Sequence, residues 1–293
     1  MKNKFMINFL KYKWLYFLIS AVVIGAGLFS IAKWGFLYSI DFTGGSNFEF
    51  QMNKIVQKDK IQKVLDLNKI SVVSLKLKEK NILLRTKVLD QDKESLLKKE
   101  LEAKLKIKIT VLRSETVGPV LGKEAIRKTF FASILAVVGI LIYMSFAFKG
   151  FNFAFSAVLA MFHDLLVVVG TYSLLGHFFG AEVDTMFVTA VLTTMSFSVH
   201  DTIVIFDKIR EYNELGETKN IEEASNKAVT ETMVRSLNNS MTIVFMLLAL
   251  TMMGGSTIRF FILTLLIGTI TGTYSSPFVA TPILVWLEKH KQK

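Results

Sequence analysis

Long apolar runs alternate with polar segments along the 293-residue chain, and the length of each run indicates its structure. A helix rises about 1.5 Å per residue, so about 20 apolar residues cross a hydrocarbon layer of about 30 Å. The pattern therefore predicts six transmembrane helices, at residues 14–33, 129–148, 153–176, 185–206, 237–254 and 260–287.

The polar region between the first and second spans has the pattern of a folded domain. Alternating apolar and polar positions predict strands, and apolar positions at helical spacing predict helices. The order β-α-β-β-α-β that results is the order of the ferredoxin-like motif. We expect strands at 46–52 and 109–117, two more within 72–89 that meet near Lys80 and Asn81, and helices at 57–67 and 91–106.

The predicted fold class is a mainly α membrane protein with a small extracytoplasmic α+β domain after its first helix. Residues 1–33 hold the cytoplasmic N-terminus and the first transmembrane helix, and residues 34–125 form the extracytoplasmic domain. Residues 126–293 form a five-helix membrane domain with a cytoplasmic C-terminus and a charged cytoplasmic loop of helical character at 207–235.

Composition supports this reading and excludes several classes of function. The chain is 52% hydrophobic, and its net charge of +11 is confined to the polar segments between long uncharged runs. That distribution indicates a lipid membrane as partner and argues against nucleic acid. The chain has no cysteine, which excludes disulfides, thiolate metal sites and a cysteine nucleophile. We expect no cofactor.

Lysine and arginine also predict the orientation of the chain in the cytoplasmic (inner) membrane. The two ends and the 207–235 segment are basic, whereas the short loop at 177–184 has no lysine or arginine and that at 254–259 has only Arg259. The positive-inside rule therefore places both termini in the cytoplasm. Residues 34–125 lie outside, because long loops cross largely regardless of charge.

Ionisable residues inside the spans are the first functional candidates, because a charge at that depth is costly unless something compensates it. Asp201 ends a stripe of the fourth span, and its neighbour His200 points about 100° away. Asp164 lies on a stripe of the third span, with His163 likewise off that stripe. The stripes consist of Ala190, Thr194, Ser198 and Asp201, and of Ser156, Ala160, Asp164 and Val168.

The fifth and sixth spans complete this set. Arg235 opens a polar cluster with Asn238, Asn239 and Thr242, at about the depth of Asp201. At about 1.5 Å per residue, Asp164 lies about 15–17 Å from the cytoplasmic edge and Asp201 about 8–9 Å. Two carboxylates and a guanidinium could therefore meet in the inner half of the bundle. The last span carries small residues suited to close helix approach, at Thr264, Gly268, Gly272 and Ser276.

The polar residues of the spans could also have purely structural roles, with no part in proton transfer or catalysis. Asp164 could be a cap or a water-facing residue, and Arg235 could simply follow the positive-inside bias. His163 and His200 suit packing or hydrogen bonding. We expect no metal site, because adjacent histidine and aspartate diverge and no third ligand has suitable spacing.

Five motifs resemble those of the SecD–SecF protein-export family. They occur in the family's order, from directly after the first span to the start of the fifth, and the resemblance covers residues 1 to about 287. Six spans with one large outer domain after the first match the layout of the SecF branch. The motifs are IDFTGGS at 40–46, ETVGPVLGKE at 115–124, MFHDLLVVVGTYSLLG at 161–176, SFSVHDTIVIFDKIRE at 196–211 and RSLNNSMT at 235–242.

The resemblance implies a fold similar to half of a resistance-nodulation-division exporter, and a transport subunit that is not an enzyme. It implies SecD as partner, association with the Sec translocon channel, and use of the proton-motive force to promote export of unfolded polypeptide. Asp201 and Arg235 match the family's proton-pathway residues, which act together with an aspartate of SecD. Asp164 matches the aspartate of a His-Asp pair. His200 replaces a frequent asparagine, which could modulate the local proton affinity.

The two outer motifs have a structural reading and a mechanical one. In the first, Gly44 and Gly45 permit a tight turn, and Asp41 can accept hydrogen bonds from exposed backbone donors. In the second, Gly118 and Pro119 end a strand and begin the second span. We favour a structural junction, and a hinge at both motifs is the alternative.

Two other functions are compatible with membrane carboxylates. A small-molecule exporter of the resistance-nodulation-division type usually has twelve spans and two outer domains, twice what this chain contains. An intramembrane aspartyl protease would need Asp164 and Asp201 as its pair, but neither lies in a GxGD motif. Burial and a neighbouring arginine act in opposite directions on a carboxyl group's proton affinity, so a group held between them can exchange protons near neutral pH. We therefore favour proton-coupled export.

Overall fold

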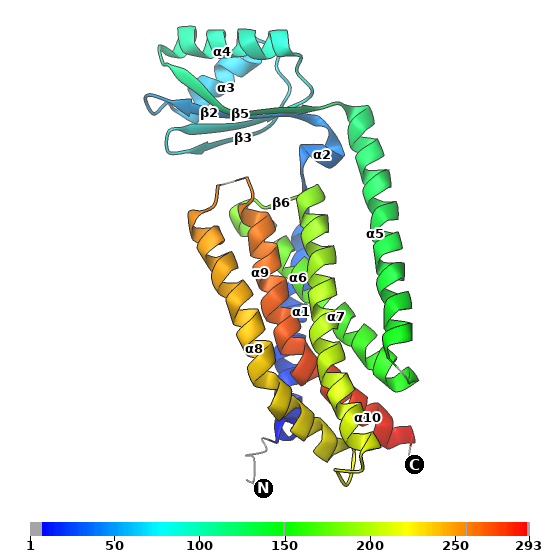
Figure 1. Cartoon of the computed structure of the whole chain (residues 1–293). Coiled ribbons are helices and arrows are strands. Elements are labelled where there is room, and N and C mark those ends of the chain that lie inside the picture. The colour runs from blue at the N-terminus through cyan, green and yellow to red at the C-terminus, as the bar shows by residue number, and fades with distance from the viewer. Residues whose placement is uncertain (1–7, 149, 256, 292–293) are drawn as a thin grey trace. The chain divides into compact units, whose positions relative to one another are not determined.

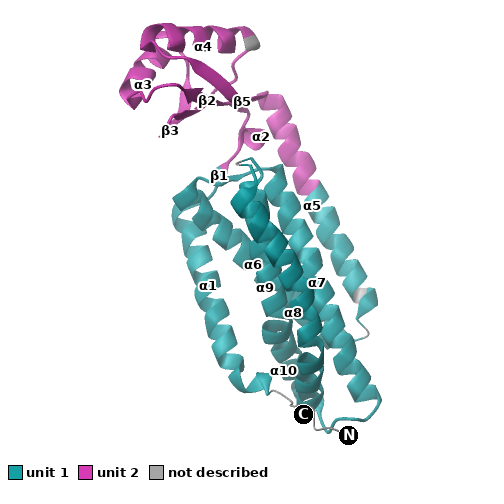
Figure 2. Ribbon diagram, turned by 60° about the vertical axis from the view of Figure 1, so that its left-hand side comes forward, with its two compact units in different colours: residues 1–37, 132–293 teal, residues 38–131 magenta. Residues whose placement is uncertain are grey.

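Apolar helices form the larger of the two units into which the chain folds. The computed structural model describes residues 8–148, 150–255 and 257–291. One unit comprises residues 1–37 and 132–293, and the other residues 38–131 (Figure 2). Within the described residues, six helices are long and apolar enough to cross a membrane, which confirms the predicted number. They are Phe9–Trp34, Pro119–Met144, Phe151–Phe179, Thr185–Glu214, Ile221–Met253 and Arg259–Lys291.

The elements of the helical unit follow the apolar runs (Figure 1). Helix α5 begins in the smaller unit and continues into this one. The elements are η1 (Phe9–Tyr12), α1 (Lys13–Trp34), β1 (Leu37–Tyr38), α5 (Pro119–Ala147), α6 (Phe151–Phe179), β6 (Glu182–Val183), α7 (Thr185–Glu214), α8 (Ile221–Met253), α9 (Arg259–Ser275), η2 (Ser276–Ala280) and α10 (Thr281–Lys291).

The segment at 207–235, predicted as a cytoplasmic loop of helical character, is mostly helical. Helix α7 continues to Glu214, and α8 begins at Ile221 after an Asn220 cap that accepts from the Glu223 backbone N–H at 2.9 Å. Only residues 215–220 lie outside these two helices. The helices persist because apolar residues continue at helical spacing and are buried between α7 and α8. Examples are Ile209, Tyr212, Ala224 and Ala228.

The last predicted span, at 260–287, is interrupted near its middle. Helix α9 ends at Ser275, a π-helical segment η2 covers Ser276–Ala280, and α10 continues from Thr281. Pro277 lies in that segment. Proline has no backbone N–H and its ring crowds the preceding turn, so the α-helical hydrogen-bond pattern cannot pass through it unchanged.

Helix α1 packs against α6 through a line of small residues that the sequence patterns did not identify. Gly27 faces Gly170 so closely that a Cβ atom on either would lie 2.7 Å from the other's Cα. The Ser30 and Ser173 hydroxyls are hydrogen-bonded at 2.8 Å. Small residues are common where membrane helices approach closely. In the sequence, the spacing of Ser20, Gly27 and Ser30 could have indicated this helix contact.

This crossing makes a direct prediction for two glycines on one helix. Gly27→Ala should destabilise the protein by about 1–3 kcal/mol, because the new methyl overpacks the contact with Gly170. Gly25→Ala should not, because a Cβ at Gly25 would meet no atom within 4 Å. Thermal unfolding in detergent measures both. Equal midpoints for the two variants would contradict the close packing of α1 on α6.

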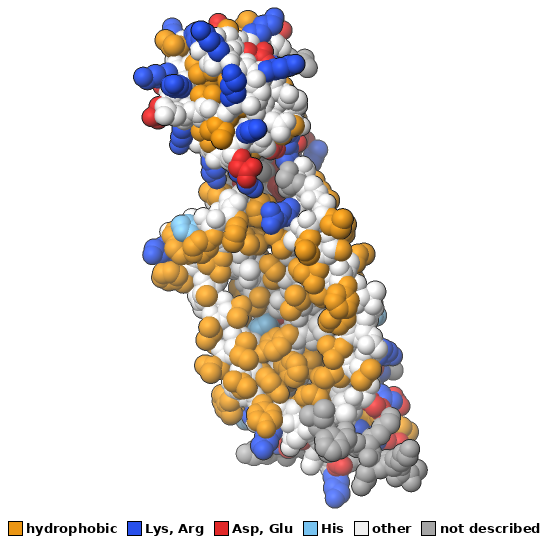
Figure 3. Space-filling view, turned by 90° about the vertical axis from the view of Figure 1, so that its left-hand side faces the viewer, with side chains coloured by type: hydrophobic (Ala, Val, Ile, Leu, Met, Phe, Trp, Pro, Cys, Tyr) orange, Lys and Arg blue, Asp and Glu red, His pale blue; other side chains and the backbone are white. Residues whose placement is uncertain are grey.

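Hydrophobic side chains are spread over the face of the helical unit that Figure 3 shows. In a water-soluble protein such a surface would be unusually large, whereas a membrane-spanning bundle presents it to lipid. Helix α5 shows this well, because its aromatic side chains are exposed. Phe130, Phe131, Tyr143 and Phe146 are all more than half exposed, from 59% to 83%.

The smaller unit is a four-stranded antiparallel sheet in the order β3-β4-β2-β5, with α3 and α4 on one face (Figure 1). This strand order, with the β-α-β-β-α-β sequence of elements, confirms the ferredoxin-like topology predicted above. The elements are α2 (Ile40–Thr43), β2 (Gly45–Met52), α3 (Lys58–Leu67), β3 (Val72–Lys78), β4 (Asn81–Thr86), α4 (Gln91–Leu105) and β5 (Ile109–Val117).

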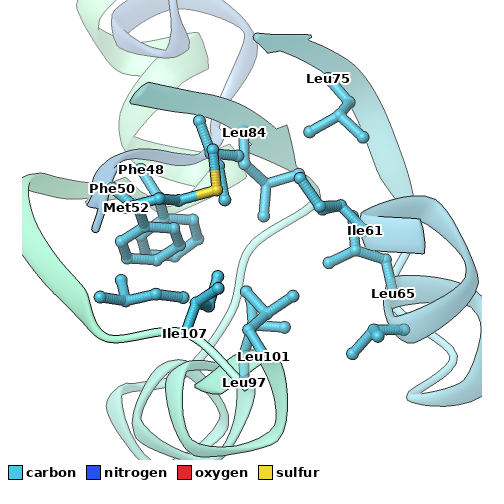
Figure 4. Packing of buried hydrophobic residues seen from close by; sticks show 13 residues of the cluster. Phe48, Phe50, Met52, Ile61, Leu65, Leu75, Leu84, Leu97, Leu101 and Ile107 are labelled. Carbon is cyan, nitrogen blue, oxygen red and sulfur yellow. The ribbon is translucent and has the colours of Figure 1, made fainter. Parts of the chain in front are cut away.

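Alternation along the strands builds the core of this unit. Phe48, Phe50 and Met52 of β2 point to the same side and are each at most 1% exposed. The rings of Phe48 and Phe50 stack with centroids 5.5 Å apart. Leu97 and Leu101 of α4 approach them from the helical layer (Figure 4). The side-chain period of two in strands thus directs one face of β2 to the core.

The two outer motifs meet within this unit. Gly44 and Gly45 have φ of +69° and +123°, which confirms the predicted tight turn. A Cβ at Gly44 would lie 3.0 Å from Cα of Pro119. Strand β5 ends at Val117 and α5 begins at Pro119, whose fixed φ suits a first helical position. The segments 40–46 and 115–124 therefore form one packed junction.

Candidate functional site

Asp164 holds the buried end of the candidate site. It lies midway along α6, is 3% exposed, and both carboxylate oxygens have partners. Oδ1 lies 2.8 Å from Nδ1 of His163. Oδ2 accepts hydrogen bonds from the hydroxyls of Ser198 on α7 and, at 2.6 Å, Ser275 on α9. One carboxylate thus joins three membrane-spanning helices.

Close packing of α9 on α7 makes this convergence possible. A Cβ at Gly272 would lie 3.1 Å from Cα of Ser198, and one at Gly268 would collide with the side chain of Thr194. The small-residue stripe of the last span therefore has the packing role that the sequence predicted. The stripes of α6 and α7 also face inward, with Ser156, Ala160, Val168 and Ala190 buried.

His163 extends the network to a fourth helix. Its Nε2 lies 2.8 Å from the Ser20 hydroxyl of α1, while Nδ1 faces Asp164. The expectation that His163 and Asp164 diverge is therefore wrong. The angle of about 100° separates their Cβ directions only, and the imidazole is long enough to turn back along the helix. A serine hydroxyl can donate or accept, so Ser20 suits both the neutral and the protonated ring.

Asp201 lies one helical turn beyond Ser198 on α7 and is half-buried. Its Oδ2 accepts a hydrogen bond from Ser236 of α8 at 3.0 Å. Within the described part of the chain, Asp201 has no ion pair shorter than 4.0 Å, so the expected direct meeting with Arg235 is not observed. Ser236 faces Asp201, and consecutive helical residues diverge by about 100°.

A small cavity borders Asp201. Its volume is about 20 Å³, and its polar lining includes His200, Asn239, Ser240 and Thr273. A cavity of about 10–15 Å³ can hold one water molecule if polar partners are available. Thr273 of α9 donates to Ser240 of α8 at 2.7 Å in the same wall. The cavity therefore has the size and polarity for a single ordered water beside the carboxylate.

Hydroxyl groups occupy the helix contact between the two carboxylates. Ser198 donates to Asp164, and Thr202, one turn further along α7, bonds Ser276 at 2.9 Å. Asp201 lies on the same turn as Thr202. The structure thus brings Asp164 and Asp201 to two connected places on α6–α9 and not into one shared site. Sequence patterns missed Ser236 and Ser275, because a lone serine in a span has no distinctive signal. They also missed Ser20, although it shares the small-residue spacing of α1 with Gly27 and Ser30.

Hydroxyl and imidazole groups surround the deepest carboxylate of the site. Among the described residues, no lysine or arginine forms an ion pair with Asp164 within 4.0 Å. Its charge is compensated instead by two hydroxyl donors and by His163. No group of three histidine, aspartate or glutamate side chains is placed to hold a metal within the ranges the structure describes.

Helix α8 carries polar side chains outward. Arg235, Asn238, Asn239 and Thr242 are exposed, next to exposed apolar residues of the same helix. His200 of α7 is also exposed. Polar groups within spans nearly always face protein or a water-filled cavity and avoid lipid. This face of the helical unit is therefore incompletely covered by the chain's own helices.

Residues 97–290 match the family described as "Protein export membrane protein SecD/SecF, C-terminal". The chain belongs to this family. SecF from Anaerolinea thermophila is 36% identical over 96% of this chain and 94% of that protein. SecF from Thermobaculum terrenum is 37% identical over 97% of this chain and 95% of that protein.

A solved structure has the same fold. SecDF from Thermus thermophilus, described as a translocon-associated membrane protein, superposes with a TM-score of 0.84 at 30% identity. The match covers 97% of this chain and 39% of that one. The chain is thus a multi-pass membrane protein of the SecF family of protein translocase subunits and functions in protein export. This result agrees with the motif-based interpretation and disfavours the small-molecule exporter and the aspartyl protease.

Proposed function

We propose that this SecF-family chain, together with a SecD partner, uses the proton-motive force to promote polypeptide export across the cytoplasmic membrane. The observation that carries the proposal is the buried carboxylate of Asp164, which is hydrogen-bonded to His163, Ser198 and Ser275 inside the helical bundle. An ionisable group in that position is costly and is usually functional. A proton that binds there changes the bonds between helices directly.

The donor and acceptor roles of the groups around Asp164 show how a bound proton changes these bonds. An ionised carboxylate only accepts, so both serine hydroxyls can donate to the same oxygen. A protonated carboxyl carries an O–H donor, so at least one partner around it must change its role. Ser198 belongs to α7 and Ser275 to α9, so a proton on Oδ2 displaces one of their hydrogen bonds and alters the contact between these helices. A proton on Oδ1 is instead met by His163.

The free energy supplied by one proton is similar to that of one or two hydrogen bonds between membrane helices. A proton that crosses 100 mV delivers about 2.3 kcal/mol. Hydrogen bonds between membrane helices contribute about 0.6–1.7 kcal/mol each. One proton can therefore bias a rearrangement of one or two such bonds.

Asp201 is the proposed exchange point with the cytoplasmic side. It is half-buried and adjoins a cavity that can hold one water, with His200 and Asn239 in the cavity wall. A proton could pass from Asp201 to Asp164 along the hydroxyl-lined contact of α7 and α9. Arg235 keeps a permanent positive charge beside this route, and His200 modulates it.

The exposed polar face of α8 supports a membrane partner. Arg235, Asn238 and Asn239 would be costly in lipid, and the helices of a second subunit would cover them. We assign this role to SecD, because the SecDF chain that matches here extends well beyond the matched part. Contact with the Sec translocon channel and with the unfolded exported polypeptide follows from the same proposal.

Orientation and mechanical coupling complete the proposal. The distribution of lysine and arginine supports cytoplasmic termini and an external position for residues 34–125. The packed junction of Asp41, Gly44 and Gly45 with Gly118 and Pro119 is the proposed rigid link that passes helix movement to the outer domain. The packing of Gly44 against Pro119 supports this role, since α5 starts there.

Imposed gradients in vesicles test the coupling. We expect export that depends on the chain and its SecD partner to fall several-fold when a protonophore collapses the proton gradient. A sodium ionophore should have no effect. Dependence on sodium alone, or on neither ion, would contradict proton coupling. Vesicles that lack the SecF chain provide the control for gradient effects on the translocon itself.

A further inference from the structure

A cleft in the smaller unit has the composition of a peptide-binding site. Its volume is about 400 Å³, within the range of about 300–1,000 Å³ typical of ligand sites. The lining comes from three segments, namely the end of α3, the stretch after β4 and the first turns of α4. Its side chains include Lys69, Lys87, Lys93, Ile70, Leu96 and Leu97.

The floor of the cleft is apolar and continuous with the core. Leu97 is 2% exposed and belongs to the core cluster, and Ile70 packs against that cluster (Figure 4). Leu96, by contrast, is 60% exposed although it lies one residue from the core. Val88 is also exposed, at 40%. An apolar side chain of a ligand would therefore find apolar surface that the chain leaves uncovered.

The cleft has a one-sided charge. Three lysines line it and no aspartate or glutamate does. Lys93 has a weak pair with the exposed Asp90 at 3.8 Å, and the described residues place no acidic group within 4.0 Å of Lys69 or Lys87. Residues 38–131 contain 20 lysines and arginines against 12 aspartates and glutamates, a net charge of +8. A ligand that complements the positive charge of this cleft is therefore anionic.

An adjacent strand edge favours polypeptide as that ligand. Residues 68–71 of the lining lead directly into β3, which starts at Val72 and forms one edge of the sheet. An edge strand has unpaired backbone groups that can bind an extended chain, with side-chain pockets supplying selectivity. A lipid headgroup could use the lysines but not the strand edge.

We propose that this cleft binds a short extended segment of the exported polypeptide in which apolar residues are flanked by aspartate or glutamate. The inference rests on the proposed export function and adds a docking site for the client chain. The apolar side chains occupy the floor beside Leu96 and Leu97. The flanking carboxylates lie near Lys69 and Lys87, and the backbone continues along β3.

Fluorescence anisotropy with the full chain in nanodiscs tests the site. The probe is a labelled unfolded peptide with the central sequence Asp-Leu-Leu-Glu, compared with one that has lysine in place of both acids and one that has serine in place of both leucines. We expect the first to bind at least tenfold more tightly than either, since each exposed ion pair and the apolar contact add to binding.

Variants locate the binding. Lys69→Gln combined with Lys87→Gln should weaken binding of the acidic peptide roughly tenfold, and Leu96→Asn should also weaken it. The matched control is Lys60→Gln combined with Lys99→Gln, which removes two exposed lysines outside the cleft. An equal loss in the control, or equal binding of the basic peptide, would overturn the site.

Lipid vesicles test whether the ligand of the cleft is lipid and not peptide. Binding of phosphatidylglycerol vesicles that requires Lys69 and Lys87, without peptide binding, would replace the peptide by lipid and overturn the proposal. The result is separate from the test of proton coupling, because Asp201→Asn should leave peptide binding unchanged. If the peptide does not bind to the cleft, the proposed export function is still tested independently by the gradient experiment.

Discussion

Asp201→Asn is expected to abolish gradient-driven export while the protein still folds and assembles. Asparagine has nearly the same shape and can still accept the hydrogen bond from Ser236, but it cannot bind and release a proton. At 100 mV the lost driving force is about 2.3 kcal/mol, which corresponds to roughly a 50-fold bias between conformations. Export into inverted vesicles, with and without a protonophore, measures the change.

The matched control for this variant lies on the same helix. Asp207 is exposed near the end of α7 and pairs with Arg210 at 3.0 Å. Asp207→Asn makes the same chemical change and should leave export at the wild-type rate. Co-purification with SecD should be normal for both variants. Wild-type, protonophore-sensitive export by Asp201→Asn would remove Asp201 from the pathway.

Asp164→Asn is expected to produce the second large loss of export. The amide oxygen can accept from Ser198 and Ser275, and the amide N–H can face His163 if the ring changes its tautomer. The network therefore survives without the carboxylate. Asp164→Leu, in contrast, leaves three partners unsatisfied and should lower the free energy of unfolding by about 2–5 kcal/mol. Export and thermal unfolding in detergent together separate the two effects.

A buried hydroxyl elsewhere on α6 provides the comparison. Ser173→Ala removes two hydrogen bonds, one with the Ser30 hydroxyl of α1 and one to the Gly35 carbonyl at the end of that helix, without touching Asp164. It should lower stability modestly and retain gradient-driven export. If Asp164→Asn exported as well as Ser173→Ala, Asp164 would be a structural carboxylate. The proton pathway would then be confined to the surroundings of Asp201.

Periodicity explains what could be predicted along the chain. The spans were visible because 20 apolar residues have few alternatives to a membrane helix, and the outer domain was visible because strands and helices repeat at different periods. The inward stripes of α6, α7 and α9 followed from the same helical geometry. The helical character of residues 207–235 was predicted, but not that α7 runs unbroken to Glu214, because charged residues on its outer face concealed the buried Ile209 and Tyr212.

The candidate site was only partly predictable. Asp164 and Asp201 stood out as single charges in apolar surroundings, and their depth could be calculated from the helix rise. Their partners could not be predicted, because a serine that bonds a carboxylate looks the same in a sequence as one that bonds its own helix. Ser198 and Ser275 bond the carboxylate of Asp164, whereas Thr264 bonds the backbone carbonyl of Phe260 in its own helix.

Sequence alone determined the number of membrane helices, the ferredoxin-like topology and the two acidic residues inside the bundle, since each depends on patterns local to one segment. Tertiary structure decided that Asp164 bonds helices α7 and α9, that His163 reaches Ser20 on α1, and that Asp201 faces Ser236 and not Arg235. These contacts depend on which helices approach and how closely. Contacts such as Gly27 on Gly170 and Gly272 on Ser198 set that distance, and they join residues far apart in the chain.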